Sequence, residues 1–425
     1  MLFRTVIGAG LVTLFCFTQA SADNDRVVIP GTFIEWDFGS FVFVKDLPPA
    51  GGMTCEDDPT QVQCEGFRHI TSFVNKKKNE VVLFGGINDF PFRGPNDPIR
   101  PINNNVFTLD LEKNLPQRKW EFRSTDDEVD APWFTTTKGF ATIGKKVYLA
   151  SDDTDAPNFV WSFNPKTYTF EEIATTEFEP DEFTRASDGC AVGVTVPYEN
   201  EERIYHIGGR NQAAGGTTNA ARYYSITNDE WIEVESMAEV RSHLGCAAVY
   251  RNGKPLIYAV GGGDGEPDPG VVYKSIEVYD VLEDEWETLS HTLLQARTRM
   301  GVVNVDNKHL IVVGGDATCA GGGGSNCEAD RPLDTLEVID IKRGNKVFSS
   351  DEYQIPKLNQ PRQTPATTLA VMKGKQGYEL LLTGGHTCKS PQDPGDPCST
   401  GIEALRNTEV LNFVKILSPP MMMAE

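Results

Sequence analysis

The stretch that decides the fold runs from Arg241 to Leu289 and reads RSHLGCAAVYRNGKPLIYAVGGGDGEPDPGVVYKSIEVYDVLEDEWETL. It holds four short apolar runs, each bounded by Gly, Asn or Asp, which is the pattern of β-strands. The runs are Leu244–Tyr250, Leu256–Val260, Ser275–Tyr279 and Glu285–Thr288. Four such strands with tight connections form an antiparallel meander. A lone meander buries too little apolar surface to be stable, so it needs neighbours that repeat it.

The same frame recurs along most of the chain. Five copies have an arginine, a strand that ends in Gly-Gly and a further apolar strand, and three of the five carry a Trp, at Trp120, Trp231 and Trp286. Besides Gly261-Gly262, the pairs are Gly85-Gly86, Gly208-Gly209, Gly314-Gly315 and Gly384-Gly385. A degenerate copy lies between the first two and has Ser151-Asp152 in place of the glycines. This pattern resembles the kelch repeat.

The resemblance implies an all-β fold, a six-bladed kelch β-propeller, in residues 23–425. The blades are expected at about 66–123, 133–173, 183–236, 240–290, 296–350 and 360–414. The last blade lacks a fourth strand, and the segment 32–45 carries a strand pattern that ends in Asp46-Leu47-Pro48-Pro49. We therefore expect an N-terminal strand near Phe41–Val44 to complete the last blade. The competing closure uses Phe413–Leu417 from the C-terminal end.

Residues 1–22 have the pattern of a secretory signal peptide. Arg4 precedes the apolar run Val6–Thr18, and Ala20-Ser21-Ala22 is an A-x-A cleavage site. The run is too short to predict a membrane span, which needs about 20 apolar residues. The sequence therefore predicts a secreted protein that begins near Asp23.

The formal net charge is −22. A nucleic-acid partner is not expected, because phosphate contacts need a basic face. The negative charge has two interpretations: it keeps the protein soluble, or it forms a surface that binds cations, mineral or basic partners. The chain also lacks a zinc-finger spacing, a P-loop and a GxSxG motif, and we predict no cofactor and no resident metal.

The cysteines fit an oxidising compartment. Apart from Cys16 in the leader, three pairs bracket short polar loops, where a disulfide would clamp each loop. These predicted disulfides are Cys55–Cys64, Cys319–Cys327 and Cys388–Cys398. Cys190 and Cys246 each follow a repeat arginine by five residues. They are either buried free thiols or a bridge between adjacent blades, which requires Cα atoms within about 7 Å.

Arginines recur at the start of the blades and are expected to open onto the loop-rich face of the ring. Arg presents a planar fork suited to carboxylate, sulfate or phosphate. Kelch domains that bind acidic peptides use arginines at equivalent positions. The alternative is that these side chains bond neighbouring loop carbonyls and Asp side chains. Arg299 is our first candidate for a ligand-facing residue, and the full predicted ligand-binding set is Arg185, Arg241, His243, Arg297, Arg299 and Arg362.

Three functions fit these features. The first is a secreted binding or interaction protein that recognises an extracellular protein or an anionic small molecule at the loop-rich face. The second is a sugar-acid enzyme such as a sialic-acid mutarotase, for which Glu266 or Asp264 could supply a carboxylate. The third is an acidic extracellular-matrix or mineral-associated protein. Calcium could bind the acidic loops Asp152-Asp153-Thr154-Asp155 and Asp264-Gly265-Glu266-Pro267-Asp268, although neither fits the EF-hand frame.

Overall fold

The structure is a computed structural model, and it describes most of the repeated core but only part of the loops. The described residues are 36–44, 46–47, 67–68, 70–85, 87–88, 106–123, 140–150, 160–173, 186–211, 216–264, 270–317, 331–349, 355–372, 377–388 and 402–415.

The chain forms six blades, each a four-stranded antiparallel sheet. Blade 1 contains β3 (Thr71–Asn75), β4 (Glu80–Phe84), β6 (Val106–Asp110) and β7 (Trp120–Arg123). Blade 2 contains β8 (Phe140–Ile143), β9 (Lys146–Ala150), β10 (Val160–Asn164) and β11 (Thr169–Glu172). Blade 3 contains β13 (Cys190–Val196), β14 (Glu201–Ile207), β17 (Ala221–Ser225) and β18 (Glu230–Val234). Blade 4 contains β19 (Gly245–Arg251), β20 (Lys254–Val260), β21 (Ile276–Asp280) and β22 (Glu285–Thr288).

Blades 5 and 6 complete the set. Blade 5 contains β23 (Gly301–Val305), β24 (His309–Val313), β25 (Leu336–Asp340) and β26 (Lys346–Ser349). Blade 6 contains β27 (Ala366–Val371), β28 (Gly377–Thr383), β31 (Thr408–Lys415) and β1 (Trp36–Val44). Short strands pair in the connections. β2 (Phe67–Arg68) pairs with β5 (Ile87–Asn88), and β29 (His386–Cys388) pairs with β30 (Ile402–Ala404). β15 (Arg210–Asn211) lies between β12 (Ala186–Ser187) and β16 (Gly216–Thr217) and pairs with both. Among the described residues, 3-10 turns occur as η3 (Leu115–Gln117) and η4 (Ile341–Arg343).

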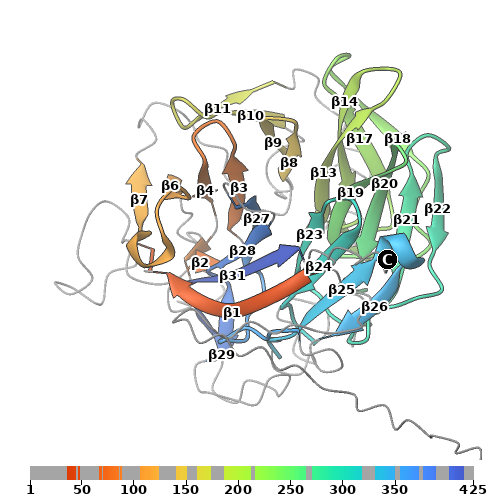
Figure 1. Cartoon of the computed structure of the whole chain (residues 1–425). Coiled ribbons are helices and arrows are strands. Elements are labelled where there is room, and N and C mark those ends of the chain that lie inside the picture. The colour runs from red at the N-terminus through yellow and green to blue at the C-terminus, as the bar shows by residue number, and fades with distance from the viewer. Residues whose placement is uncertain are drawn as a thin grey trace, which may run out of the picture.

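The blades stand side by side around a common axis, which gives a propeller (Figure 1). The first strand of each blade lies innermost. These inner strands contact one another in the order β8, β13, β19, β23, β27 and β3. Phe73 of β3 and Phe140 of β8 lie in one apolar cluster, so the contact between blades 1 and 2 completes the ring. The predicted all-β, six-bladed architecture is confirmed.

Blade 6 is closed by the N-terminal strand. β1 is its outermost strand and pairs antiparallel with β31, from Trp36 opposite Lys415 to Val44 opposite Thr408. Phe413 belongs to β31, the third strand, and therefore does not form the alternative outer strand. Of the two closures considered from the sequence, the structure has the one that uses Phe41–Val44.

The second and third strands of a blade are covered on both faces by neighbouring blades. All five residues of β24 and of β25 are buried, so the apolar residues of these strands do not alternate with exposed polar ones. The Gly-Gly pairs lie where the next blade approaches most closely. Gly261 has φ +56°, and a Cβ placed on it would lie 2.6 Å from the carbonyl oxygen of Arg297. Glycine is needed there both for its backbone conformation and for space.

Among the described residues, no helix is long and apolar enough to cross a membrane.

Candidate functional site

Three repeat arginines lie inside the blades. Arg241, Arg297 and Arg362 are each 0% exposed. In blade 5, the Arg297 guanidinium donates to Glu337 Oε1 at 2.5 Å and to the carbonyl oxygen of Gly314 at 2.8 Å. Burial disfavours the charged form and lowers the pKa of Arg297, and the same holds for Arg362, while the glutamate opposes this shift.

The glutamates that pair with these arginines also bind backbone amides. Glu337 Oε2 accepts from the amide of Leu294 at 2.7 Å, and Oε1 accepts from the amide of Gln295 at 3.1 Å. Glu277 and Glu409 make the same two contacts with the segments before Arg241 and Arg362. We call this arrangement the arginine–glutamate unit. It fixes the segment that leads into a blade's first strand to the third strand of that blade.

The structure therefore places Arg241, Arg297 and Arg362 inside the blades and not on the loop-rich face where the ligand-binding prediction expected them. Their burial leaves no surface for a ligand that approaches from solvent. All three arginines do bond nearby carbonyls, as the alternative expected, but the acid that pairs with each is a glutamate and not an aspartate. Arg185 lies outside the described residues.

Four residues that precede the inner strands form a backbone ladder around the channel mouth. The His243 amide donates to Asp188 O at 2.7 Å, the Arg299 amide to His243 O at 2.8 Å, and the Thr364 amide to Arg299 O at 2.8 Å. Their φ values lie between 51° and 61°, a conformation that non-glycine residues rarely adopt and that often marks functional positions. We call Asp188, His243, Arg299 and Thr364 the mouth belt.

The mouth belt contains the two remaining predicted ligand-binding residues. Arg299 keeps 11% of its side chain exposed. Its guanidinium donates to Asp316 Oδ2 at 3.2 Å and to Gln363 Oε1 at 3.1 Å, so two different blades orient it. His243 is nearly buried, with Nε2 3.1 Å from Asp188 Oδ1. The structure thus brings Arg299 and His243 to the same rim and separates both from the three buried arginines.

A cavity of about 120 Å³ lies just inside the belt, on the propeller axis. Its walls come from the starts of the inner strands of all six blades and include Ser72, Phe140, Cys190, Cys246, Val302 and Thr367. Most of these groups are small or apolar, so the charged side chains concentrate at the rim.

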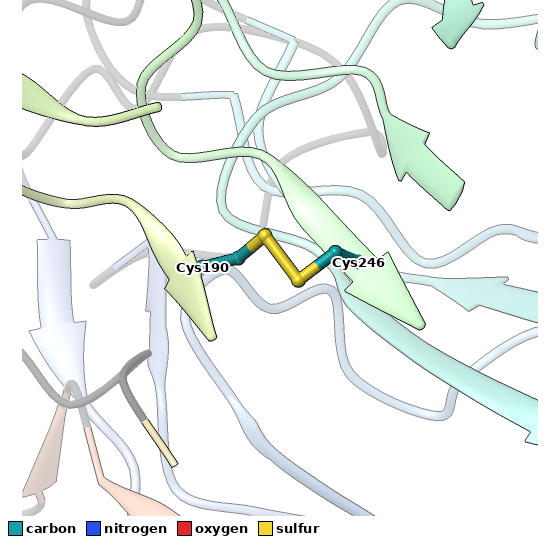
Figure 2. The surroundings of a disulfide bond; sticks show 2 residues. All are labelled: Cys190 and Cys246. Carbon is teal, nitrogen blue, oxygen red and sulfur yellow. A yellow bond between two sulfur atoms is a disulfide. The ribbon is translucent and has the colours of Figure 1, made fainter. Parts of the chain in front are cut away.

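A disulfide joins two neighbouring inner strands on the wall of this cavity. Cys190 begins β13 and Cys246 lies in β19, with their Cα atoms 6.1 Å apart (Figure 2). The sequence left open whether these two cysteines are free thiols or a disulfide between adjacent blades. In the structure they form the disulfide, between blades 3 and 4. Cys388 is also disulfide-bonded. Its predicted partner Cys398, and the predicted pairs Cys55–Cys64 and Cys319–Cys327, lie outside the described residues.

We expect the Cys190→Ser/Cys246→Ser double variant to be less stable by about 2–4 kcal/mol, because the bridge restricts the unfolded chain. The cysteines are separated by 56 residues, so the closed loop is long. The midpoint of urea unfolding would measure the change, and a non-reduced peptide map of the parent protein would verify the bridge. An unchanged midpoint in the double variant would show that the bridge adds nothing to stability.

The described residues contain no group of three or more His, Cys, Asp or Glu side chains placed to hold a metal ion. The acidic loops considered for calcium lie outside those residues, except for Asp264. The calcium prediction therefore stays a prediction.

Sequence reasoning missed the partners of the arginines. The signal was present, because an acidic residue recurs within otherwise apolar third strands as Glu277, Glu337 and Glu409. A charge at one position of three buried strands needs a buried counter-charge. Asp316 and Gln363 gave no comparable signal, since their place at the rim depends on how adjacent blades meet.

Comparison with known proteins agrees with this architecture. Residues 244–291 match the family model of the kelch motif. A segment of 116 residues, 27% of this chain, is 30% identical to kelch repeat-containing protein kel-10 from Caenorhabditis elegans. The match covers 19% of that protein. Together with the six blades, these matches support a kelch-repeat β-propeller, a fold that suggests a role in protein interaction.

Proposed function

We propose that this protein is a secreted interaction protein that binds an acidic group of a protein partner at the channel mouth. The observation that carries the proposal is the difference between Arg299 and the repeat arginines. The arginine–glutamate units bury the side chains of Arg241, Arg297 and Arg362 completely. The Arg299 side chain, in contrast, lies at the rim of the channel and is 11% exposed. A guanidinium held by Asp316 and Gln363 is already oriented, which reduces the entropy lost when it binds a carboxylate.

Secretion is supported by two features. The first is the pattern of residues 1–22, with Arg4, an apolar run and Ala20-Ser21-Ala22. The second is the Cys190–Cys246 bridge, because disulfides persist mainly in oxidising compartments.

When the full chain is expressed in secretion-competent cells, we expect the protein in the medium to begin near Asp23. N-terminal sequencing of the secreted product would measure this. A variant with Val6–Thr18 interrupted by two aspartates should stay in the cells. Product in the medium that keeps residues 1–22, or export of the interrupted variant, would contradict the proposal.

Arg299→Ala should weaken binding to acidic peptides at least tenfold, because each lost charge-assisted hydrogen bond contributes about 1.5–3 kcal/mol. An array of acidic peptides and their amide counterparts, followed by titration of the best binder, would measure the effect. Asp316 is 0% exposed and loses its guanidinium partner, so the free energy of unfolding should also fall, by about 3–5 kcal/mol. Binding is therefore compared only after circular dichroism shows that the variant is folded.

Arg251→Ala is the matched control, because Arg251 is an exposed arginine at the opposite end of β19. It removes the same charge and should leave binding unchanged. Equal loss in both variants would mean that net charge, and not the mouth belt, governs binding.

The enzymatic and mineral-associated alternatives stay predictions, because the acidic loops on which both depend lie largely outside the described residues.

A further inference from the structure

The cavity on the propeller axis has a polar end at the mouth belt and a largely apolar wall. Thr364 of the belt lies in its lining. The larger apolar side chains of the wall come from blades 1, 2, 4 and 5 and are Ile70, Phe140, Leu244, Met300 and Val302. Two hydroxyls of the wall are already bonded, because Ser72 pairs with Thr368 and Thr367 donates to the carbonyl oxygen of Pro365. The wall therefore offers a surface for an apolar group.

Two buried polar groups at the mouth belt have no hydrogen-bond partner in the described part of the chain. They are the hydroxyl of Thr364 and Nε2 of Gln363, and the two residues are 4% and 1% exposed. The Gln363 carboxamide is held at its other atom, because its Oε1 accepts from the Arg299 guanidinium at 3.1 Å. Its Nε2 is therefore a donor that lies close to this guanidinium. A buried donor without an acceptor is costly, and a bound acceptor would remove that cost.

Two carboxylates at the rim do not block an anion, because both already have partners. Asp188 Oδ1 lies 3.1 Å from His243 Nε2. Asp316 is 0% exposed and accepts from the Arg299 guanidinium and from the amide of Arg331. Surface charges further away than about 8 Å are largely screened at physiological salt, so the net charge of −22 does not exclude an anion here.

The volume of the cavity limits the apolar group that can enter it. The cavity measures about 120 Å³. An apolar cavity of about 150 Å³ takes up benzene, so a tail of about five or six carbon atoms fits this space. Acetate would leave the apolar wall without a contact. A dicarboxylate would place a second charge against that wall, which is unfavourable.

We propose that the channel mouth binds a small monocarboxylate with an apolar tail, for which benzoate is the probe. The tail enters the cavity and the carboxylate stays at the belt, where Arg299, Gln363 and Thr364 donate hydrogen bonds to it. Gln363 and Thr364 reach the carboxylate by rotation about their side-chain bonds. The inference goes beyond the proposed function, because the ligand is a small molecule whose binding needs no protein partner.

The test titrates the full chain with benzoate, benzyl alcohol and acetate at one pH and ionic strength, by saturation-transfer NMR and calorimetry. Benzyl alcohol keeps the ring without the carboxylate, and acetate keeps the carboxylate without the tail. We expect benzoate to bind at least about tenfold more tightly than either. Equal binding of benzoate and benzyl alcohol, or no benzoate binding at millimolar concentration, would overturn the proposal.

Variants of the cavity locate the bound acid. Val302→Phe fills the cavity and should abolish benzoate binding. Val371→Phe is the matched control, because Val371 is 66% exposed at the opposite end of β27, outside the cavity, and benzoate binding should be retained. Thr364→Val keeps the shape of the side chain without the hydroxyl, and should weaken benzoate about fivefold. It also provides the second variant if Val302→Phe does not fold.

Benzoate binding that persists in folded Val302→Phe, or that is unchanged in Thr364→Val, would place the acid elsewhere and overturn the proposal. Acidic peptides are titrated separately in the absence of benzoate. Peptide binding that depends on Arg299, in a protein that does not bind benzoate, would contradict this inference and leave the proposed function standing.

Discussion

Arg297→Ala is expected to lower the free energy of unfolding by about 3–5 kcal/mol, because removal of one partner leaves a buried carboxylate without its counter-charge. Arg297 and Glu337 are 0% and 1% exposed, so water cannot replace the lost guanidinium without opening the blade. The variant also leaves the carbonyls of Gly314 and Thr335 without this donor. The shift in urea midpoint, with the slope of the transition held constant, measures the effect.

The control for this prediction is Arg251→Ala, which removes an exposed arginine and should change stability by less than about 0.5 kcal/mol. The double variant Arg297→Met/Glu337→Met should recover part of the loss, since a buried ion pair can often be exchanged for apolar residues. Recovery should be incomplete because the amides of Leu294 and Gln295 lose their acceptor. If Arg297→Ala were no more harmful than Arg251→Ala, the arginine–glutamate unit would not be a source of stability.

Phe38→Ala should destabilise the protein by about 3–5 kcal/mol, the range for truncation of a buried phenylalanine. Phe38 lies in the closing strand β1, is 0% exposed and packs on Phe413 with ring centroids 5.2 Å apart. Both rings belong to a core cluster that reaches into blade 5 through Val303 and Phe348. The lost contacts therefore weaken the closed ring as well as blade 6.

Phe43→Ala is the matched control, since Phe43 lies in the same strand but is 50% exposed. Its truncation should cost less than about 1 kcal/mol. Thermal unfolding of the two variants, followed by near-ultraviolet circular dichroism, would compare them directly. A similar loss in both variants would contradict the closure of blade 6 by β1.

The fold was predictable because the signals for it are local and repeated. Short apolar runs and Gly pairs mark strands and their ends within one blade, without reference to distant residues. The observed strands therefore match the predicted ranges closely: β22 covers the predicted Glu285–Thr288, and β19 differs from the predicted Leu244–Tyr250 by one residue at each end. Closure by β1 was also predictable, because blade 6 lacked a fourth strand and the N-terminal segment had no other place in the repeat.

The site was less predictable because it depends on side-chain direction. Arg297 and Arg299 are two residues apart, and a strand pattern would place both on one face. Positive φ at Arg299 breaks that alternation and turns its side chain to the rim. The partner of Arg297 lies 40 residues further on, so no local rule reveals which arginine enters the blade.

The register of the closing strand has a consequence for the order in which the protein matures. Trp36 of β1 pairs with Lys415 of β31. The strand β1 is therefore synthesised long before β31, the strand with which it pairs. Until then β1 has no partner in its final sheet, while meanders such as blade 4 can pair within their own sequence. We therefore expect the ring to lock only after synthesis has passed β31, and the interval before locking is when the apolar residues of β1 are exposed to chaperones or to aggregation.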